Sequence, residues 1–414
     1  MSHLAEAITI RNITFKNRII KAAMSEALAN DAGQPSQLHF NLYETWAKGC
    51  LGCAITGNVM VDFRAKNEPG VVVIESERDL AKLQQWAALG KKYDMVQLVQ
   101  LSHPGRQCPK GLNKETVAPS AVPFSPALAT TFGTPRELRE DEIIDIIQRF
   151  AISAQICEKA GFEGIQLHGA HGYLISQFLS PLTNKRQDQW GGSIENRMRF
   201  LLEIYKAVRA ATSDQFIISV KLNSADFQRG GITEDEVVAV FKAIDAAGID
   251  LIEISGGTYE APAMAGAKED KRKASSIARE AYFLDFAEKI RKEVQCHLMV
   301  TGGFRTVVGM NAALDSGACD FIGIARPLAV ETDLTDRLIA GQDVRYAVDK
   351  IKTGIPIVDK MAIMEIIWYA AQFKDIAKGN QPNPKLSPLK VFLNYVKGNV
   401  KAVIKGQINS RKSA

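Results

Sequence analysis

The sequence has no long hydrophobic run. No apolar stretch in its 414 residues approaches the roughly 20 residues that a helix needs to span a bilayer. The first residues also lack a basic segment followed by an apolar run, which is the pattern of a secretory signal. With 46% hydrophobic and 23% charged residues, the composition is typical of a globular protein with a large core. We therefore expect a cytoplasmic protein.

Cysteines are few and scattered. The six are Cys50, Cys53, Cys108, Cys157, Cys296 and Cys319. Their spacing forms no disulfide framework, which suits a reducing compartment. Cys50 and Cys53 have the spacing of a redox CxxC pair, but they bridge the end of a predicted helix and the next strand. We expect two buried thiols there.

Acidic residues are missing from the end of the chain. From Ile376 onward there are eight Lys or Arg and no Asp or Glu, while the whole chain has a net charge of +5. The preceding residues are therefore slightly acidic as a group, and attraction to polyanions belongs to the tail. We predict no nucleic-acid partner for this protein.

The sequence also has no GxGxxG dinucleotide fingerprint after any apolar run. Instead, short Ile- and Val-rich runs alternate with stretches of helical spacing. The expected strands are 18–24, 54–61, 95–101, 163–168, 216–222, 249–255, 297–302 and 320–325. The expected helices are 36–49, 79–91, 140–160, 193–213, 233–247, 279–293, 305–317 and 332–340. Asp79, Ser193 and Thr233 are candidate N-caps. Eight strand–helix pairs predict an α/β fold of the (β/α)8 TIM-barrel class.

Segments at both ends extend this barrel. Residues 8–17 alternate and turn, which predicts a small hairpin. We assign residues 1–340 to the barrel and residues 341–414 to a C-terminal helical extension, with helices over 343–378. A last basic amphipathic helix has an apolar face formed by Leu389, Phe392, Leu393, Val396, Val400 and Ile404. Packing on the barrel or on a second subunit, hence a homo-oligomer, is one interpretation, and contact with an anionic membrane surface is the other.

The densest group of chemical side chains follows the fourth expected strand. His168, His171 and Tyr173 occupy six residues together with two glycines. Burying two imidazoles and a phenol without partners is costly, so this stretch indicates a site. An H-x-x-H metal site would need further ligands, and no third ligand stands nearby, so we expect no metal. The histidines could instead be structural, and Tyr173 could be a packing ring that walls a pocket.

Barrel enzymes place their chemistry on the loops after the strands. The seventh and eighth expected strands end in Gly302-Gly303 and Ala325-Arg326. Backbone N–H groups near a helix N-terminus and a guanidinium group form the recurrent phosphate site of barrels. The glycines could also form simple tight turns.

Gln100 and Lys221 end the third and fifth expected strands and indicate what carries the phosphate. A flavin ring gains negative charge at N1 on reduction, which a nearby lysine stabilises, and an amide can pair with its pyrimidine edge. A Schiff-base lysine in an aldolase-type barrel is the competing hypothesis for Lys221, and a simple ion-pair lysine is a third.

A longer stretch of the sequence resembles the signature of a known family. Residues 168–197 read HGAHGYLISQFLSPLTNKRQDQWGGSIENR, and this block closely resembles the signature of the old yellow enzyme family. Supporting matches extend from Lys16–Arg18 to Gly323–Pro327, so the resemblance covers roughly the first 340 residues. The family consists of FMN-dependent NAD(P)H oxidoreductases, many of which act as ene-reductases. No cysteine cluster follows the barrel, so we do not expect an iron–sulfur cluster.

The resemblance implies a role for each matching position. Ala23, Met24 and Ser25 would line the flavin, Gln100 and Lys221 would hold its pyrimidine end, and Gly302, Gly303, Ala325 and Arg326 would bind its phosphate. His168 and His171 would bind the oxygen of the acceptor, and Tyr173 would donate a proton. Ala23 replaces a usual proline, Ser25 stands where Thr or Cys is common, and Lys221 replaces Arg, keeping the charge but losing the guanidinium fork.

We therefore predict an FMN-dependent enzyme that takes electrons from NADH or NADPH and reduces the C=C bond of a small activated alkene, such as an enone or a nitroalkene. Flavin oxidase or demethylase chemistry is a nearby alternative. A phosphate-binding Schiff-base barrel that uses Lys221, or a non-catalytic barrel anchored by its basic tail, is a more distant one.

Overall fold

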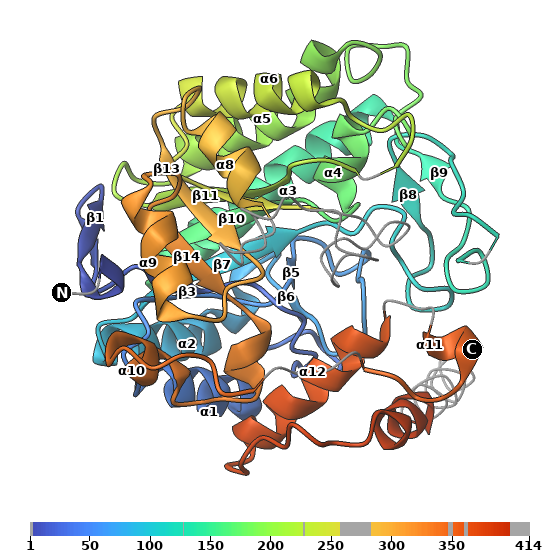
Figure 1. Ribbon diagram of the computed structural model, residues 1–414. Coiled ribbons are helices and arrows are strands. Elements are labelled where there is room, and N and C mark those ends of the chain that lie inside the picture. Colours follow the sequence, from blue (N-terminus) through green and yellow to red (C-terminus); the bar gives the residue numbers. More distant parts are fainter. Residues whose placement is uncertain are drawn as a thin grey trace.

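The computed structural model describes residues 3–126, 128–226, 228–256, 283–346, 351–359 and 363–397. A closed sheet of eight parallel strands forms its centre (Figure 1). The strands are β3 (Ile19–Lys21), β4 (Cys53–Ile55), β7 (Val96–Ser102), β10 (Gly164–Gly169), β11 (Ile217–Asn223), β12 (Leu251–Ser255), β13 (His297–Thr301) and β14 (Phe321–Ile324). Pairing of β14 with β3 and of β10 with β7 completes the ring. The predicted (β/α)8 barrel is confirmed.

One expected strand is divided in two. The run 54–61 forms β4 and a second short strand, β5 (Val59–Met60), which pairs with β7 and with β6 (Val72–Val73). The chain turns between them at Gly57, where a Cβ atom would lie 2.6 Å from the carbonyl oxygen of Met24. The short strands β8 (Val117–Ala118) and β9 (Arg136–Glu137) pair in the long loop that follows β7.

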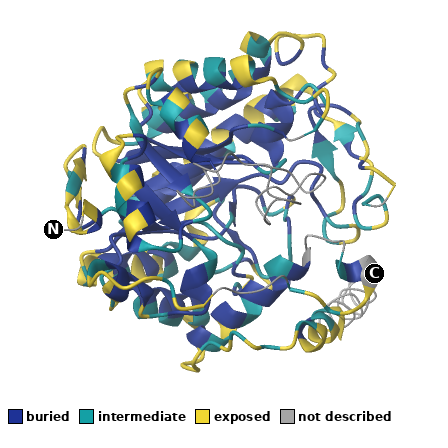
Figure 2. Cartoon of the chain, viewed as in Figure 1, coloured by how far each residue is buried: buried dark blue, intermediate teal, exposed yellow. Residues whose placement is uncertain are grey.

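Helices surround the sheet, with buried inner faces and exposed outer faces (Figure 2). They are α1 (Gln37–Ala47), α2 (Leu80–Lys92), α3 (Glu140–Ala160), α4 (Leu174–Leu179), α5 (Ile194–Ala211), α6 (Glu234–Ala246), α8 (Leu284–Ile290), α9 (Val307–Asp315) and α10 (Leu334–Ile339). The spacing of Ile143, Ile146, Ile147 and Phe150 turns one apolar stripe of α3 toward the strands. The first residues of the helix expected at 279–293 lie outside the described ranges.

Local signals fix several helix ends. Thr233 accepts a hydrogen bond from the backbone N–H of Glu236, and the Glu236 side chain accepts one in return, as the capping box predicts. Ser193 likewise accepts a backbone hydrogen bond at the start of α5. Asp79 occupies the N-cap position of α2, as predicted, but its side chain makes no capping hydrogen bond. The same residue ends the short 3-10 turn η2 (Glu77–Asp79) that leads into α2.

The N-terminal hairpin closes one end of the barrel. Strands β1 (Ile8–Ile10) and β2 (Ile13–Phe15) pair antiparallel, which confirms the predicted hairpin. Ile10 and Phe15 pack among side chains from the interior of the barrel, with the Phe15 ring 5.0 Å from that of Phe321. This end of the barrel is therefore filled by side chains, and the strands open at their carboxyl ends.

Cys50 and Cys53 both have free thiols, and they differ in exposure. Cys53 is buried inside the barrel, and its burial raises the pKa of the thiol well above the ordinary value. Cys50 is half-buried, so the prediction of two buried thiols is wrong for this residue. A hydrogen bond to Asp336, followed by partial burial, raises the pKa of the Cys50 thiol as well. Neither group is therefore an activated thiolate.

The C-terminal extension is less helical than the sequence predicted. It contains α11 (Pro356–Asp359) and α12 (Ile363–Ala377), but residues 343–346 and 351–355 form no helix. Gly354 adopts a positive φ of 82°, and the Thr353 hydroxyl donates to Asp359 over 2.6 Å. Because Pro356 disfavours helix at the residue before it, the chain turns at this point.

Helix α12 packs against α1 of the barrel (Figure 1). The fully buried ring of Phe373 lies 5.4 Å from that of Trp46, at an angle of 89°. Trp368, Tyr369 and Ile376 belong to the same hydrophobic core as the barrel helices. The apolar face of α12 is therefore continuous with the barrel core.

Residues 388–397 form a helix, as expected, and residues 398–405 of the predicted element lie outside the described ranges. Val391 is buried, whereas Leu389, Leu393 and Val396 are 40%, 57% and 41% exposed. Phe392 of the predicted face packs against the core together with Val391, whereas the other three side chains do not pack on the barrel. Contact with a second subunit or a membrane surface stays a prediction. Within the described ranges, no helix is both long and apolar enough to cross a membrane.

The contact between α12 and α1 predicts the effect of truncating Phe373. Phe373→Ala should lower the free energy of unfolding by about 3–5 kcal/mol, because it removes a fully buried aromatic ring. Chemical denaturation followed by tryptophan fluorescence measures this change. Leu393→Ala is the control, since it truncates an exposed side chain and should change stability by less than about 0.5 kcal/mol. Equal effects of the two substitutions would contradict the packing described here.

Candidate active site

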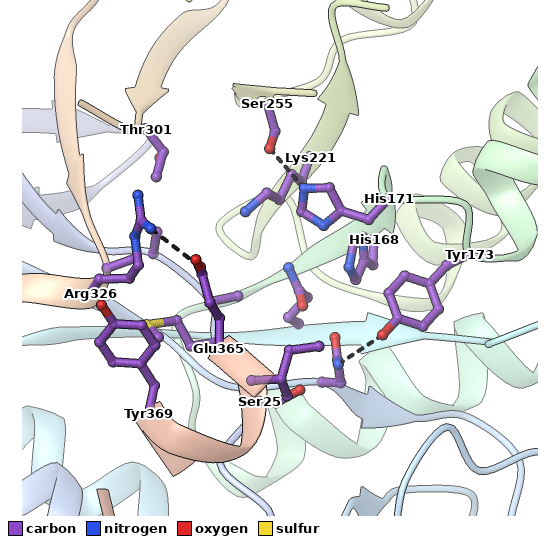
Figure 3. Close-up of a pocket in the computed structure, with 18 of the residues that line it drawn as sticks. Ser25, His168, His171, Tyr173, Lys221, Ser255, Thr301, Arg326, Glu365 and Tyr369 are labelled. Carbon is purple, nitrogen blue, oxygen red and sulfur yellow. Dashed lines mark hydrogen bonds and ion pairs between the residues drawn. The ribbon is translucent and has the colours of Figure 1, made fainter. Parts of the chain in front are cut away.

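A pocket of about 210 Å³ opens at the carboxyl ends of the strands. Its wall contains Ala23, Met24, Ser25, Gln100, His168, His171, Tyr173, Lys221, Gly302, Ala325 and Arg326. These are all the predicted site residues except Gly303, which follows Gly302 in the chain. Figure 3 shows His168, His171 and Tyr173 on one side of the pocket and Arg326 on the other. Their individual roles stay predictions.

Strand register brings the polar side chains to one level. On neighbouring strands, His168 of β10 pairs with Lys221 of β11, and Lys221 pairs with Glu253 of β12. Gln100 of β7 pairs in the same way with Gln166 of β10. Since side chains at paired positions of parallel strands point to the same face, these groups share the barrel interior.

Three aromatic rings form the donor side of the pocket. The His168 ring lies 4.5 Å from the Tyr173 ring and 5.2 Å from the His171 ring, to which it is nearly perpendicular. Burial, reinforced by the positive charge of Lys221, holds the pKa of both histidines well below the ordinary value. Both imidazoles are therefore neutral at physiological pH. Nδ1 of His168 accepts from the Ala170 backbone N–H over 3.4 Å, which places the ring hydrogen on Nε2.

The backbone of His171 has an uncommon conformation, with φ of 60°. The backbone N–H of His171 donates to the side-chain oxygen of Asn223 over 3.3 Å. The ring Nε2 of His171 lies 2.8 Å from the hydroxyl oxygen of Ser255. Such a left-handed residue persists only where its surroundings hold it, and here two neighbouring strands do so. The orientation of the Ser255 hydroxyl selects which nitrogen of His171 carries the hydrogen.

Tyr173 lies at the edge of the pocket and is 3% exposed. Its phenolic oxygen accepts from Nδ2 of Asn67 over 3.2 Å and from Nδ2 of Asn58 over 3.4 Å. Two amide donors aimed at a phenol oxygen stabilise the negative charge that develops when the phenol gives up its proton. The arrangement therefore favours proton donation by Tyr173.

The floor of the pocket is a fixed polar network. Gln100 donates from Nε2 to Gln166 over 2.7 Å, and Gln166 donates in turn to Glu253 over 2.9 Å. Lys221 forms an ion pair with Glu253 at 2.9 Å. All four side chains are buried, so their charges and dipoles are weakly screened by water.

The opposite end of the pocket can accept an anion. Gly302 and Gly303 lie in the loop between β13 and α9. Their φ angles of 110° and 97° fall in a region that glycine adopts readily, and their backbone is exposed because they have no side chains. Arg326 begins the 3-10 turn η4 (Arg326–Ala329) and lines the pocket. Its guanidinium forms an ion pair with the carboxylate of Glu365 at 3.3 Å. The guanidinium therefore lines the pocket while it is paired with a carboxylate from α12 (Figure 3).

Part of the wall was not predicted from the sequence. Phe283, Glu365, Ile366 and Tyr369 also line the pocket, and the last three belong to α12. Burial raises the pKa of Tyr369 to about 12. The sequence showed an apolar helical pattern here, but it carried no signal of which helix face would meet the barrel mouth.

The donor set fits FMN at both ends. A guanidinium and glycine backbone suit a phosphate, whereas Gln100 and Lys221 suit the donor and acceptor groups of a pyrimidine ring. In the part of the chain that the structure describes, no group of three or more His, Cys, Asp or Glu side chains could hold a metal ion.

Comparison with known proteins agrees with this chemistry. Residues 3–344 match the model of the NADH:flavin oxidoreductase / NADH oxidase family. The NADH-dependent flavin oxidoreductase iliE of Hypocrea jecorina is 38% identical, over 83% of this chain and 90% of its own length. The NADH-dependent flavin oxidoreductase iccE of Talaromyces variabilis is 35% identical, over 91% of this chain and 98% of its own. The match to iccE therefore extends into the C-terminal extension.

A solved structure shares the fold. The old yellow enzyme homologue from Zymomonas mobilis superposes with a TM-score of 0.70 at 25% identity, covering 81% of this chain and 92% of its own. The family model, the sequence relatives and the shared fold all agree with the chemistry of the pocket. The chain belongs to the NADH:flavin oxidoreductase / NADH oxidase family, of the old yellow enzyme type, and is an FMN-dependent oxidoreductase that uses NADH or NADPH.

Proposed function

We propose that this protein reduces the C=C bond of small activated alkenes, such as enones and nitroalkenes. The observation that carries the proposal is the group of two neutral histidines and one tyrosine, which faces a floor suited to a flavin pyrimidine ring. A hydrogen-bonded carbonyl or nitro oxygen makes the adjacent alkene electrophilic, and the tyrosine is within the same wall. These are the groups that such a reduction needs from the protein.

The proposed cofactor site uses both ends of the pocket. Arg326, Ala325 and the backbone of Gly302 and Gly303 would hold the FMN phosphate, and Gln100 and Lys221 would hold the pyrimidine. Ala23, Met24 and Ser25 would line the ring. Bound there, FMN would supply the redox chemistry that links oxidation of NADH or NADPH to reduction of the alkene.

His168 and His171 would act on the acceptor oxygen. Negative charge develops on that oxygen as the β-carbon gains a hydride, and N–H donors placed in advance stabilise the charge. Because both imidazoles are neutral, they bind the oxygen by hydrogen bonds without giving it a proton. The proton instead goes to the α-carbon, from Tyr173. The hydroxyl regains its proton from solvent after the product leaves.

In the described residues, side chains fill the amino end of the barrel, and the pocket lies at the carboxyl ends of the strands. NADH or NADPH and the alkene would therefore occupy the same space in turn, as in a ping-pong mechanism.

The ion pair with Glu253 favours a charge role for Lys221, because a Schiff-base nucleophile must be an uncharged amine. Oxidase or demethylase chemistry would use the same flavin with another acceptor, and oxygen consumption by the NADH-reduced protein tests for it.

The histidine roles predict a change in phenol binding. Phenolates place an oxyanion where the acceptor oxygen would lie, so His168→Ala and His171→Ala should each weaken phenol binding by about 10- to 100-fold, the loss of one charge-assisted hydrogen bond. Titration of the flavin absorbance band with a phenol measures this. His3→Ala, an exposed histidine far from the pocket, is the control. Unchanged phenol affinity in variants that hold a full complement of FMN would refute the oxyanion role.

The tyrosine role predicts a separation of the two half-reactions. Tyr173→Phe should slow reoxidation by an enone at least ~100-fold, because the general acid is lost, and leave reduction by NADH within a few-fold of wild type. Anaerobic stopped-flow spectroscopy measures both rates. Tyr205→Phe removes the hydroxyl of another buried tyrosine, outside the pocket wall, and should alter neither. Equal slowing of both half-reactions by Tyr173→Phe would argue against proton donation.

The ion pair between Arg326 and Glu365 predicts an effect on cofactor affinity. Glu365 is an anion beside the proposed phosphate site, so Glu365→Gln should lower the dissociation constant of FMN by a few-fold, corresponding to less than about 1 kcal/mol for a partly exposed pair. Fluorescence quenching of FMN by the apoprotein measures it. Asp375→Asn, which removes one negative charge from α12 outside the pocket wall, should have no effect. Weaker FMN binding by Glu365→Gln would show that Glu365 supports the site instead.

A further inference from the structure

Glu253 is a fully buried carboxylate within an apolar strand. It lies in the middle of Leu251–Ser255, and its side chain has no exposed surface. Its two oxygens are nevertheless well satisfied. Oε1 accepts from Lys221 Nζ over 2.9 Å and from the Thr301 hydroxyl over 2.8 Å, and Oε2 accepts from Gln166 Nε2 over 2.9 Å. A buried charge of this kind is costly unless it is paired and hydrogen-bonded, as Glu253 is.

The first consequence concerns the orientation of two amides. An ionised carboxylate only accepts hydrogen bonds, so Gln166 must turn its NH2 group to Glu253 and its oxygen to Gln100. Gln100 must then turn its own NH2 group toward Gln166. The remaining Gln100 oxygen is left as an acceptor. A flavin pyrimidine ring offers an N3–H donor between two carbonyl oxygens, which suits an amide fixed in this orientation.

The second consequence concerns charge. Lys221 carries a positive charge at the proposed pyrimidine end, and Glu253 offsets it at 2.9 Å. In a buried site, a flavin whose N1 gains negative charge on reduction responds to the sum of these two charges. Because the charges of Lys221 and Glu253 nearly cancel, the positive field that the pair exerts on the flavin is weaker than that of Lys221 alone.

The surrounding strands fix this geometry. The Thr301 hydroxyl reaches Glu253 from β13, and β14 carries Gly323 beside it. A Cβ atom at Gly323 would lie 1.9 Å from the Thr301 hydroxyl oxygen. A glycine is therefore required there to leave room for the threonine that holds the carboxylate.

We propose that Glu253 is a positioning residue that sets the reduction potential of the bound flavin, by offsetting the charge of Lys221 and by fixing the orientation of Gln100 through Gln166. This inference rests on the proposed placement of the pyrimidine ring over Gln100 and Lys221. Glu253 itself need not touch the cofactor. It acts through the two side chains that would.

The test is the midpoint potential of the FMN-loaded protein, measured by anaerobic dye equilibration. Glu253→Gln should shift the potential upward, because Lys221 is left uncompensated and stabilises the reduced flavin. Lys221→Met should shift it downward, because the carboxylate is left alone. The double variant Glu253→Gln/Lys221→Met should return close to the wild-type value. Replacing a buried ion pair by uncharged side chains is often neutral for stability, so this variant should fold even where a single one does not.

The control is Glu331→Gln. Glu331 is also fully buried and paired, with Arg337, but it lies outside the pocket wall. Its loss should cost stability and leave the potential unchanged. If Lys221→Met shifts the potential but Glu253→Gln does not, or if the double variant keeps the low potential of Lys221→Met, the role of Glu253 is overturned. If Lys221→Met itself causes no shift, the proposed placement of the flavin is wrong instead.

Discussion

The hydrogen bonds between β10 and β7 close the sheet, and the site depends on that closure. They turn a row of parallel strands into a ring, so that the carboxyl end of every strand meets at one mouth. They also place Gln166 beside Gln100, while the pairing of β10 with β11 places His168 beside Lys221. A shift of β10 by one residue would point His168 away from the pocket. It would also separate Gln166 from Gln100 and His168 from Lys221.

The barrel could be predicted because its signals are local. Ile- and Val-rich runs mark buried strands, Thr233 and Glu236 mark a helix start, and glycines such as Gly161, with φ of 96°, mark a helix end. The strand-exit residues could be predicted for a related reason. Once the chain is recognised as a barrel, topology alone brings side chains as distant as Met24 and Arg326 to the same mouth.

The missed residues depend on tertiary contacts. Glu253 stands between two isoleucines in a buried strand, and only the register with Lys221 shows that it has a partner. Glu365 and Tyr369 lie on a helix whose apolar pattern predicts packing but not the surface it packs on. The contact of Phe373 with Trp46 decides the orientation of α12, and thereby which of its side chains reach the pocket.

The contribution of α12 to the wall has a consequence for biosynthesis. Met24 and Tyr369 face the same pocket, although more than 340 residues separate them. During translation the strands of the barrel emerge first, and domains generally begin to fold from their N-terminal part. The mouth therefore lacks one wall until α12 has left the ribosome and docked on α1. At the site proposed here, binding of the flavin within a complete wall would therefore follow the synthesis of α12.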